Sequence, residues 1–260
     1  MKFWEPSRRR FLLYSLLATP VAVWADAKFV ELTWVRTRTL RLTSGTPSHR
    51  IIQITDIHHK SDRAYLESVV RKINALSPDV VLFTGDLIEN ARYVAEALEI
   101  IGQIKSPIYA VPGNHDYWSG ADFGVIGQSL AATGGALLLD QQATCANGSI
   151  HLSGDACMHL GDVNRFIPRP GAFNILMIHY PVFVEGVRDH RYDLILAGHS
   201  HGGQVRIPFY GPLITLNGVG RYDLGLFKTP AGPLYVNPGL GWLEIPLRFN
   251  CRPEITVFEV

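Results

Sequence analysis

The segment Ile51-Ile52-Gln53-Ile54-Thr55-Asp56-Ile57-His58 indicates how the chain folds. Its apolar run predicts a buried β-strand over Ile51–Thr55, and two polar side chains of the metal-ligand type follow directly. Downstream, Tyr65–Leu76 has apolar residues at helical spacing and predicts a helix that Ser77-Pro78 ends. The quoted segment therefore starts a strand–helix unit, and its strand is followed by two residues, Asp56 and His58, of types that bind metal ions.

The same unit repeats further along the chain. Strands are predicted over Val80–Thr84 and Ile108–Val111, with a helix over Ala91–Ile104 between them. Strands that alternate with helices predict a parallel sheet, and ligands bind at the carboxyl ends of its strands. Upstream, Leu32–Leu42 alternates apolar residues with Thr and Arg and predicts an exposed or edge strand.

The second half of the chain has strand patterns with little helix between them. Strands are expected over the following segments: Ile150–Leu152, Asn174–Ile178, Leu194–Ala197, Gln204–Ile207, Pro233–Asn237 and Glu254–Val260. These segments predict a second, more β-rich sheet. Because the sequence has no internal repeat or interdomain linker, we expect one α/β domain of two packed sheets.

The N-terminal residues have the three parts of a secretory signal. Arg8–Arg10 form a basic cluster, Phe11–Val23 is apolar, and Ala25-Asp26-Ala27 is a small-residue cleavage site. The run Ser7-Arg8-Arg9-Arg10-Phe11-Leu12 resembles the twin-arginine export signal, which moves folded proteins. We therefore expect residues 1–27 to be a twin-arginine-type signal peptide and residues 28–260 to be the folded domain. The expected location is the periplasm or cell envelope, with membrane anchoring if the N-terminus stays uncleaved.

Composition and charge exclude several classes of protein. The 260 residues are 47% hydrophobic and 18% charged, which excludes disordered and collagen-like chains. A net charge of +1 gives no strong field for nucleic acid, so no nucleic-acid binding is expected. The longest apolar run, Phe11–Trp24, is shorter than the roughly 18–20 residues that span a bilayer, which excludes a polytopic membrane protein.

The three cysteines leave two interpretations open. Cys145, Cys157 and Cys251 are an odd number and contain no C-x-x-C pair, which argues against a zinc ribbon or a disulfide framework. An oxidising destination allows one disulfide, most easily between Cys145 and Cys157. Three buried thiols that act as small apolar residues are the alternative.

Five clusters of metal-type ligands follow five of the predicted strands. In chain order they are Asp56-Ile57-His58, Gly85-Asp86, Gly113-Asn114-His115-Asp116, His179 and Gly198-His199-Ser200-His201. A set of Asp and His without Cys suits manganese, iron or zinc. Residues two apart in an extended segment point the same way, so Asp56 and His58 can share one ion, whereas His199 and His201 can reach two neighbouring ones. Two ions about 3.5–4 Å apart would stabilise in-line displacement at phosphorus, which predicts phosphate-ester hydrolysis.

The order D-x-H, G-D, G-N-H-D, lone His and G-H-x-H resembles the calcineurin-like metallophosphoesterases over about Arg50–Val260. The resemblance implies a four-layer α/β/β/α sandwich with two mixed β-sheets and the metals at their facing edges. Within the family, the segments His201–Arg206 and Leu247–Glu254 are similar to exported bacterial phosphodiesterases of the YaeI/YkuE type.

The resemblance also implies a role for each candidate residue. The first ion would be bound by Asp56, His58, Asp86 and His201, and the second by Asp86, Asn114, His179 and His199, with Asp86 bridging. A hydroxide between the two ions would then attack phosphorus. His115 would face the phosphate and balance its charge or protonate the leaving group. The family places an acidic residue near this histidine, and the sequence leaves both Glu89 and Asp116 open.

Together these features predict a divalent-metal-dependent phosphodiesterase with two ions, manganese in first place and iron or zinc as alternatives. We expect a monomer that acts on a phosphodiester or pyrophosphate small molecule, which could be lipid-linked, and that could associate with a membrane peripherally or through its N-terminus. One alternative is a UDP-2,3-diacylglucosamine pyrophosphatase-like hydrolase of lipid A precursors. The other is a non-catalytic metal-binding module, against which His115 argues because it is not a ligand in this scheme.

Substrate specificity is expected in three loops whose sequences match no known pattern: Tyr117–Ala132, Cys157–Pro170 and Phe209–Lys228. Within the second loop, His159 is a weak candidate for substrate contact. His59 is expected to point away from the ligands because it neighbours His58 in an extended segment.

Overall fold

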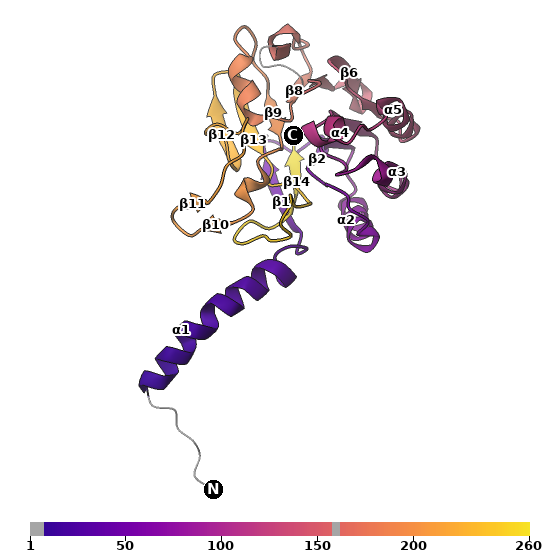
Figure 1. Cartoon of the computed structure of the whole chain (residues 1–260). Coiled ribbons are helices and arrows are strands. Elements are labelled where there is room, and N and C mark those ends of the chain that lie inside the picture. Colours follow the sequence, from indigo (N-terminus) through magenta and orange to yellow (C-terminus); the bar gives the residue numbers. More distant parts are fainter. Residues whose placement is uncertain (1–7, 158–161) are drawn as a thin grey trace.

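Two six-stranded sheets form the centre of the protein (Figure 1), in a computed structural model that describes residues 8–157 and 162–260. The first sheet has the strand order β1 (Arg36–Arg41), β14 (Glu254–Glu259), β2 (Arg50–Ile54), β3 (Val80–Phe83), β4 (Ile108–Ala110) and β5 (Ala136–Leu137). Strands β2 to β5 are parallel, whereas β14 runs antiparallel to β2 and parallel to β1. The predicted parallel strand–helix units are therefore present.

The second sheet is also mixed. Its strand order is β12 (Gly225–Thr229), β13 (Gly232–Val236), β9 (Leu194–Ala197), β8 (Phe173–Met177), β7 (Ile150–Gly154) and β6 (Gln141–Cys145). The four inner strands are parallel, and the two edge strands β12 and β6 pair antiparallel to them. A separate small hairpin consists of β10 (Arg206–Ile207) and β11 (Gly211–Pro212).

Helices α2 (Arg63–Leu76), α3 (Val94–Ile101) and α5 (Phe123–Ala132) cover the outer face of the first sheet, as Figure 1 shows on its right side. A second apolar core fills the space between the two sheets. On the outer face of the second sheet, the described residues form the 3-10 helices η4 (Asp162–Arg165) and η5 (Pro181–Gly186). The predicted four-layer sandwich is confirmed, with 3-10 turns in its fourth layer. Other short helices include η2 (Ala91–Tyr93), α4 (Asn114–Trp118), η3 (Ala146–Gly148) and η6 (His201–Gly203).

One strand belongs to a different sheet from the one that the sequence predicted. Glu254–Val260 was assigned to the second sheet by its place in the chain, but β14 lies between β1 and β2 in the first. Ile255 and Val257 pack on the helix side of this sheet, and Phe258 packs between the two sheets. A strand that is apolar on both faces fits the middle of either sheet, so its pattern alone does not identify the sheet.

Other boundaries also differ from the prediction. The strand expected over Leu32–Leu42 is shorter, because a π-helix, η1 (Asp26–Val30), and a turn precede β1. The expected specificity loop Tyr117–Ala132 contains helix α5, whose first turn is capped by the Asp122 carboxylate. The edge strands β6 and β12 were missed because their mixed sequences lack a clear alternation.

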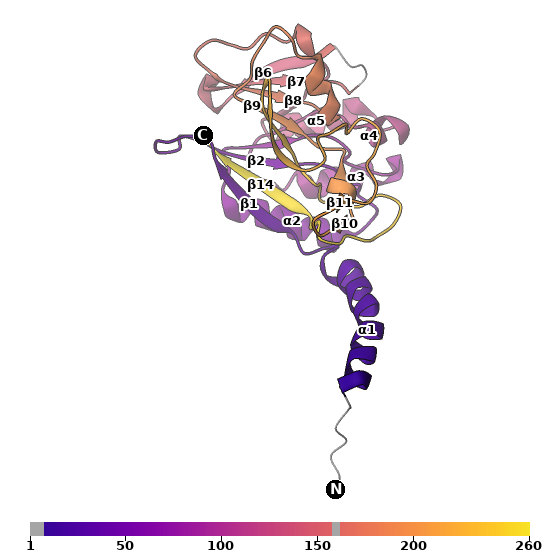
Figure 2. The same cartoon turned by 90° about the vertical axis from the view of Figure 1, so that its left-hand side faces the viewer.

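The N-terminal helix α1 (Arg8–Ala25) projects from the domain (Figure 2). Ala27, at the predicted cleavage site, is buried, and its carbonyl accepts a hydrogen bond from the Arg248 amide at 3.0 Å. In the described ranges, no helix is both long enough and apolar enough to cross a membrane.

The three cysteines are buried and free, which agrees with the interpretation as small apolar residues. The first of them, Cys145, belongs to the core between the two sheets.

Candidate metal centre

The structure brings all seven predicted ligands together where the carboxyl ends of the two sheets meet. All are buried: Asp56, His58, Asp86, Asn114, His179, His199 and His201. Each lies in a segment that directly follows a strand, namely β2, β3, β4, β8 or β9. The two halves are joined at this point because the His199 amide donates to the Asp56 carboxylate at 3.0 Å.

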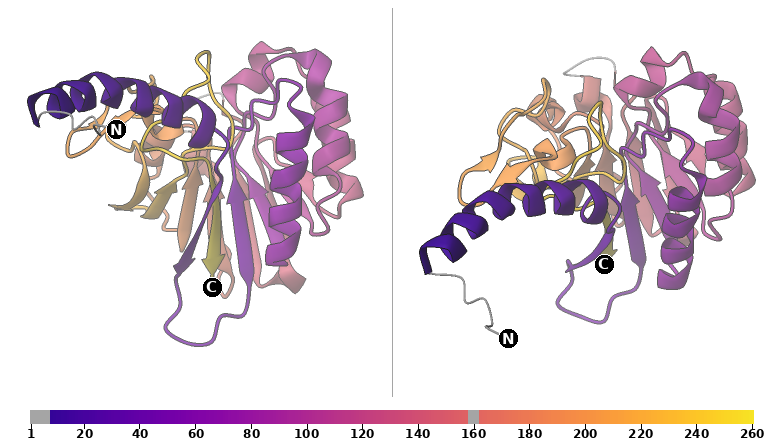
Figure 3. Two further views of the ribbon diagram at one scale, coloured as in Figure 1. Left: turned by 90° about the horizontal axis from the view of Figure 1, so that it is seen from below. Right: turned by 60° about the horizontal axis from the view of Figure 1, so that its bottom comes forward.

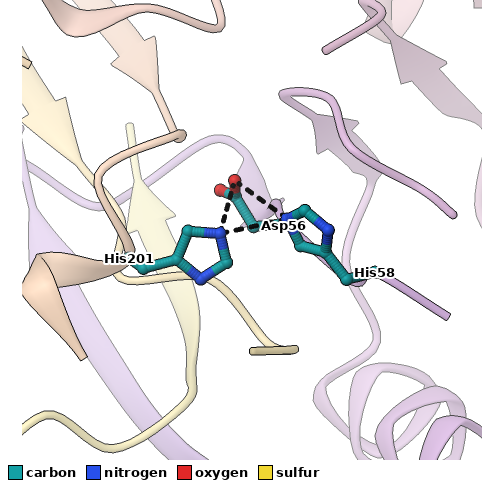
Figure 4. Close-up of side chains that lie close together, drawn as sticks. All are labelled: Asp56, His58 and His201. Atoms are coloured by element: carbon teal, nitrogen blue, oxygen red, sulfur yellow. Dashed lines mark hydrogen bonds and ion pairs between the residues drawn. The ribbon is translucent and has the colours of Figure 1, made fainter. Parts of the chain in front are cut away.

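One cluster consists of Asp56, His58 and His201 (Figure 4). The Nε2 atoms of the two histidines are 3.0 Å apart, and His201 Nε2 lies 3.3 Å from Asp56 Oδ1. His58 Nε2 lies 3.9 Å from the same oxygen. Two ring nitrogens and a carboxylate oxygen that converge in a buried place are favourable only around a proton or a metal ion, so this donor set fits a divalent cation.

The second cluster consists of Asp86, His179 and His199, with Asn114 beside it. His179 Nε2 lies 2.9 Å from Asn114 Oδ1 and 3.2 Å from Asp86 Oδ2. Nδ1 of His179 donates to the Thr84 carbonyl at 2.8 Å, which leaves Nε2 as the atom that faces the cluster. This set of oxygen and nitrogen donors also suits a borderline divalent ion.

Asp86 links the two clusters. Its Oδ2 lies 3.4 Å from His58 Nε2 in the first cluster and 3.2 Å from His179 Nε2 in the second. Its Oδ1 accepts a hydrogen bond from the His115 amide at 2.7 Å, which fixes the orientation of the carboxylate. A single carboxylate thus lies between two sets of nitrogen and oxygen donors.

Comparison with known proteins agrees with this geometry. The sequence profile of the calcineurin-like phosphoesterases matches residues 49–203. The chain belongs to this family. It is 32% identical to YkuE of Bacillus subtilis, an uncharacterized metallophosphoesterase, over 98% of this chain and 97% of that one. It is 30% identical to LpxG of Chlamydia trachomatis, a UDP-2,3-diacylglucosamine pyrophosphatase, over 95% of each chain. It is 29% identical to the phosphodiesterase YaeI of Escherichia coli, over 98% of this chain and 99% of that one.

The predicted family is therefore confirmed, and the protein is a phosphoesterase, a hydrolase of phosphoric ester bonds. The family and the two clusters together support binding of divalent metal ions. The clusters also contain the residues that the sequence pattern selected.

Glu89 contacts two histidines of the phosphoesterase site. Its Oε2 lies 2.8 Å from His58 Nδ1 and 3.2 Å from His115 Nδ1. The contact with His58 turns the Nε2 of this residue toward Asp56 and Asp86. Asp116, the other acidic candidate, instead accepts hydrogen bonds from the backbone amides of the segments that carry the ligands, at 2.9 Å each. The two carboxylates therefore have different partners: Glu89 contacts side chains and Asp116 contacts the backbone.

Two of the predicted ligand histidines have raised pKa values. Burial lowers the pKa of His58, but the nearby Asp56 carboxylate and the hydrogen bond to Glu89 outweigh it and raise the pKa to about 9. Burial likewise lowers the pKa of His179, but the charge of Asp86 and a hydrogen bond to it raise the pKa to about 9. Burial and the charge on His179 lower the pKa of His199 to about 4. At neutral pH two protons thus occupy the positions that divalent cations would take.

Five of the seven predicted ligands have an unusual backbone conformation. The φ angles of Asp56, His58, Asp86, His199 and His201 are 49°, 44°, 60°, 64° and 48°, in the left-handed region. Non-glycine residues seldom adopt this region, and strain of this kind gathers at functional sites. The surrounding fold must therefore hold the ligand segments in place.

Two glycines make the close approach of these segments possible. A Cβ atom on Gly198 would lie 2.0 Å from Thr55 Oγ1 and 2.5 Å from Asp56 Oδ2. A Cβ atom on Gly85, which has φ +98°, would lie 2.6 Å from His179 Nδ1. Close packing at the site therefore requires glycine at both positions.

Other candidates lie apart from the clusters. His59 points away, as expected, and its Nε2 lies 2.7 Å from Glu96 Oε1. His159 lies outside the described residues. Sequence reasoning did not single out Tyr180, whose ring centre is 4.3 Å from that of His199, and no motif marks this tyrosine. The sequence pattern likewise predicted no separate role for Arg248, which the structure shows to be fully buried.

Proposed function

We propose that this protein is a divalent-metal-dependent phosphodiesterase with a dinuclear centre. One ion would be held by Asp56, His58 and His201. The other ion would be held by Asn114, His179 and His199, and Asp86 would bind both ions. The supporting observation is the position of Asp86 Oδ2, within 3.4 Å of a histidine nitrogen in each cluster. When bound, the ions would supply Lewis acidity that activates water at neutral pH and offsets charge on the phosphoryl oxygens.

His115 would act on the substrate directly. Its side chain is partly exposed, lines the cleft beside the clusters and contacts Glu89 through Nδ1, so Nε2 is free to meet a substrate oxygen. Burial lowers the pKa of His115, which favours the neutral ring at pH 7. With Nδ1–H donated to Glu89, the neutral ring presents Nε2 as an acceptor. In the protonated ring, which Glu89 would stabilise, Nε2–H could donate to a non-bridging oxygen and pass its proton to the leaving group. For the acidic partner of His115 we therefore favour Glu89 over Asp116.

Hydrolysis of a nucleotide-linked lipid is a second candidate. LpxG, a UDP-2,3-diacylglucosamine pyrophosphatase, is similar over nearly the whole chain, and the cleft has a largely apolar wall. The binding-module alternative has less support, since the Glu89–His115 contact has no evident purpose in a purely structural site. Within the phosphodiesterase reading, the substrate is a phosphodiester or pyrophosphate that could be lipid-linked.

The proposed ions are manganese first, with iron or zinc as alternatives. Export in folded form by the twin-arginine pathway would allow manganese to be loaded in the cytoplasm, away from ions that bind more tightly. The motif at Ser7–Leu12 motivates this route, and the periplasm or cell envelope is the proposed destination. There the protein would act as a monomer, with its N-terminal segment as a possible membrane contact.

The test is elemental analysis of protein purified without added metal, combined with hydrolysis of bis(4-nitrophenyl) phosphate. We expect about two ions per chain, loss of activity on chelation and recovery with manganese. Asp86→Asn should lose metal and activity together. Asp79→Asn is the matched control, because this carboxylate is exposed and caps the Arg50 amide far from the clusters. Two bound ions without hydrolysis of diester, monoester or pyrophosphate would contradict the proposal and favour the binding module.

A further inference from the structure

The cleft beside the metal centre has two different walls. It encloses about 730 Å³, and His115, His199 and His201 line its polar side. The facing wall comes from two other segments, which contribute Val205, Leu213, Ile214, Leu216, Leu243 and Ile245. A phosphodiester without an apolar group would use only the first wall. The second wall therefore calls for an apolar group in the same ligand.

The apolar wall continues onto the outer surface. Ile214 is 72% exposed and Ile245 is 66% exposed, although both line the cleft. At the tip of the β10–β11 hairpin, Phe209 is fully exposed and Tyr210 is 76% exposed. The sequence from Ile207 to Gly220 contains no charged residue. An apolar surface of this extent beside a cleft indicates a docking surface.

Polar contacts at its base hold the β10–β11 hairpin in a defined position. Arg206 Nη1 donates to Asp223 Oδ2 and to the Gly202 carbonyl, at 2.8 Å each, and thereby fixes the base of the hairpin. Beyond the hairpin, the Leu213 amide donates to the Val205 carbonyl at 3.0 Å. The exposed aromatic tip is therefore held out by polar contacts at its base.

The N-terminal segment leaves the domain on the same side (Figure 3). The amides of Arg248 and Cys251 donate to the Ala27 carbonyl and the Glu31 carboxylate, so the start of η1 is attached next to the Leu243–Leu247 loop. Beyond this attachment, α1 exposes apolar side chains along its length, such as Leu16. Exposed apolar side chains thus occur both at the rim of the cleft and on the helix attached beside it.

Cations lie beside two exposed tryptophans near this surface, and one acidic residue, Glu244, lies within it. Trp24 and Trp34 are exposed, with Lys28 Nζ and the Arg252 guanidinium 5.8 and 3.6 Å from their ring centres. Tryptophan beside a cation is typical of side chains at a lipid–water interface. The sequence before α1's apolar stretch adds the basic run Arg8–Arg10, which suits anionic headgroups.

We propose that the docking face, defined as Ile207–Ile214, Leu243–Leu247 and the exposed side of α1, binds an anionic lipid surface. The cleft then receives a lipid-linked phosphodiester, with the hydrocarbon chain on the apolar wall and the phosphodiester beside His115. This inference rests on the proposed phosphodiesterase function and names its substrate class. It also explains why one site combines buried metal-type ligands with an exposed apolar rim.

The first test uses the full chain and vesicles of phosphatidylglycerol and phosphatidylcholine, with phosphatidylcholine alone for comparison. The Phe209→Ser/Tyr210→Ser variant should bind the anionic vesicles at least about tenfold more weakly in a sedimentation assay. Ile167→Ser is the matched control, because Ile167 is also 66% exposed. Its carbonyl accepts a hydrogen bond from Gln142 of β6, which is the edge of the second sheet opposite β12. Unchanged vesicle binding by the hairpin variant would overturn the proposal, as would a chain dimer that this variant separates.

The second test compares a phosphodiester that carries a dodecyl chain with bis(4-nitrophenyl) phosphate. Ile245→Ser should lower kcat/KM for the dodecyl ester about tenfold through KM. Asp79→Asn, which lies outside the docking face and the predicted specificity loops, should hydrolyse both esters as the unmodified chain does. Equal KM for both esters in the unmodified chain would overturn the lipid-chain assignment. If neither ester is hydrolysed, the proposed phosphodiesterase function fails. The docking proposal is then tested by binding alone, measured with the vesicles and with dodecyl phosphonate.

Discussion

Replacement of Arg248 by methionine should destabilise the protein and weaken its metal site together. The Arg248 side chain is fully buried, and its guanidinium donates to the carbonyls of Pro238, Gly239, Gly241 and Cys251 at 2.5–3.3 Å. Methionine has a similar length and fills the space, but it donates no hydrogen bond. The variant therefore isolates the effect of the lost donors.

The expected loss follows from these contacts. Each buried carbonyl left without a donor costs about 1–3 kcal/mol, and partial relaxation of the loop should limit the total to about 3–5 kcal/mol. For a chain of this size that loss lowers the melting temperature by roughly 10 °C. The same loop supports the first cluster, because the amides of Leu240 and Gly241 donate to the carbonyls of Thr55 and Asp56 at 3.0 and 2.7 Å. Metal affinity should therefore fall as well.

Urea unfolding, thermal unfolding and metal titration measure these effects. Arg252→Met is the matched control, since Arg252 lies in the same segment but its guanidinium packs over the exposed Trp34 ring. This control should lose less than about 1 kcal/mol and keep its metal affinity. If Arg248→Met unfolds at the same urea concentration as the unmodified chain, the carbonyl contacts do not carry the stability assigned to them. If it is destabilised but binds metal normally, the link from the loop to Asp56 is wrong.

Three further predictions concern the site itself. His115→Asn should lower kcat for an aryl diester at least about 100-fold at unchanged metal content, and a parallel loss of metal would refute a role outside the ligand set. Gly198→Ala should abolish metal binding in elemental analysis, because its Cβ would lie 2.0 Å from Thr55 Oγ1. Metal binding should release protons, since His58 and His179 have pKa values near 9 without metal and must be neutral to ligate. Affinity measured by calorimetry should therefore rise from pH 6 to pH 9, and a flat profile would contradict the protonated starting state.

Much of the site could be predicted because each candidate ligand directly follows a strand that is recognisable from the sequence. Asp56, Asp86, Asn114, His179 and His199 each follow a short apolar strand, and parallel strands bring such ends to one edge. Their residue types then indicate a divalent metal.

The parts that the sequence left open or missed depend on long-range packing. The Glu89–His115 contact depends on the path of the loop after β3, which spacing along the chain does not determine. The role of Arg248 depends on four carbonyls that only the folded loop assembles. The place of β14 is another such case, because a strand buried on both faces fits the middle of either sheet.

The position of β14 in the middle of the first sheet also determines the order of events during synthesis. β14 pairs with β2 across a sequence separation of about 200 residues, and among the described strands β1 pairs only with β14. β1 and β2 thus leave the ribosome long before their common neighbour and have free edges until it arrives. Since Asp56 and His58 follow β2 directly, metal loading should come after translation has passed Glu259, and a nascent chain stalled before β14 should bind no metal.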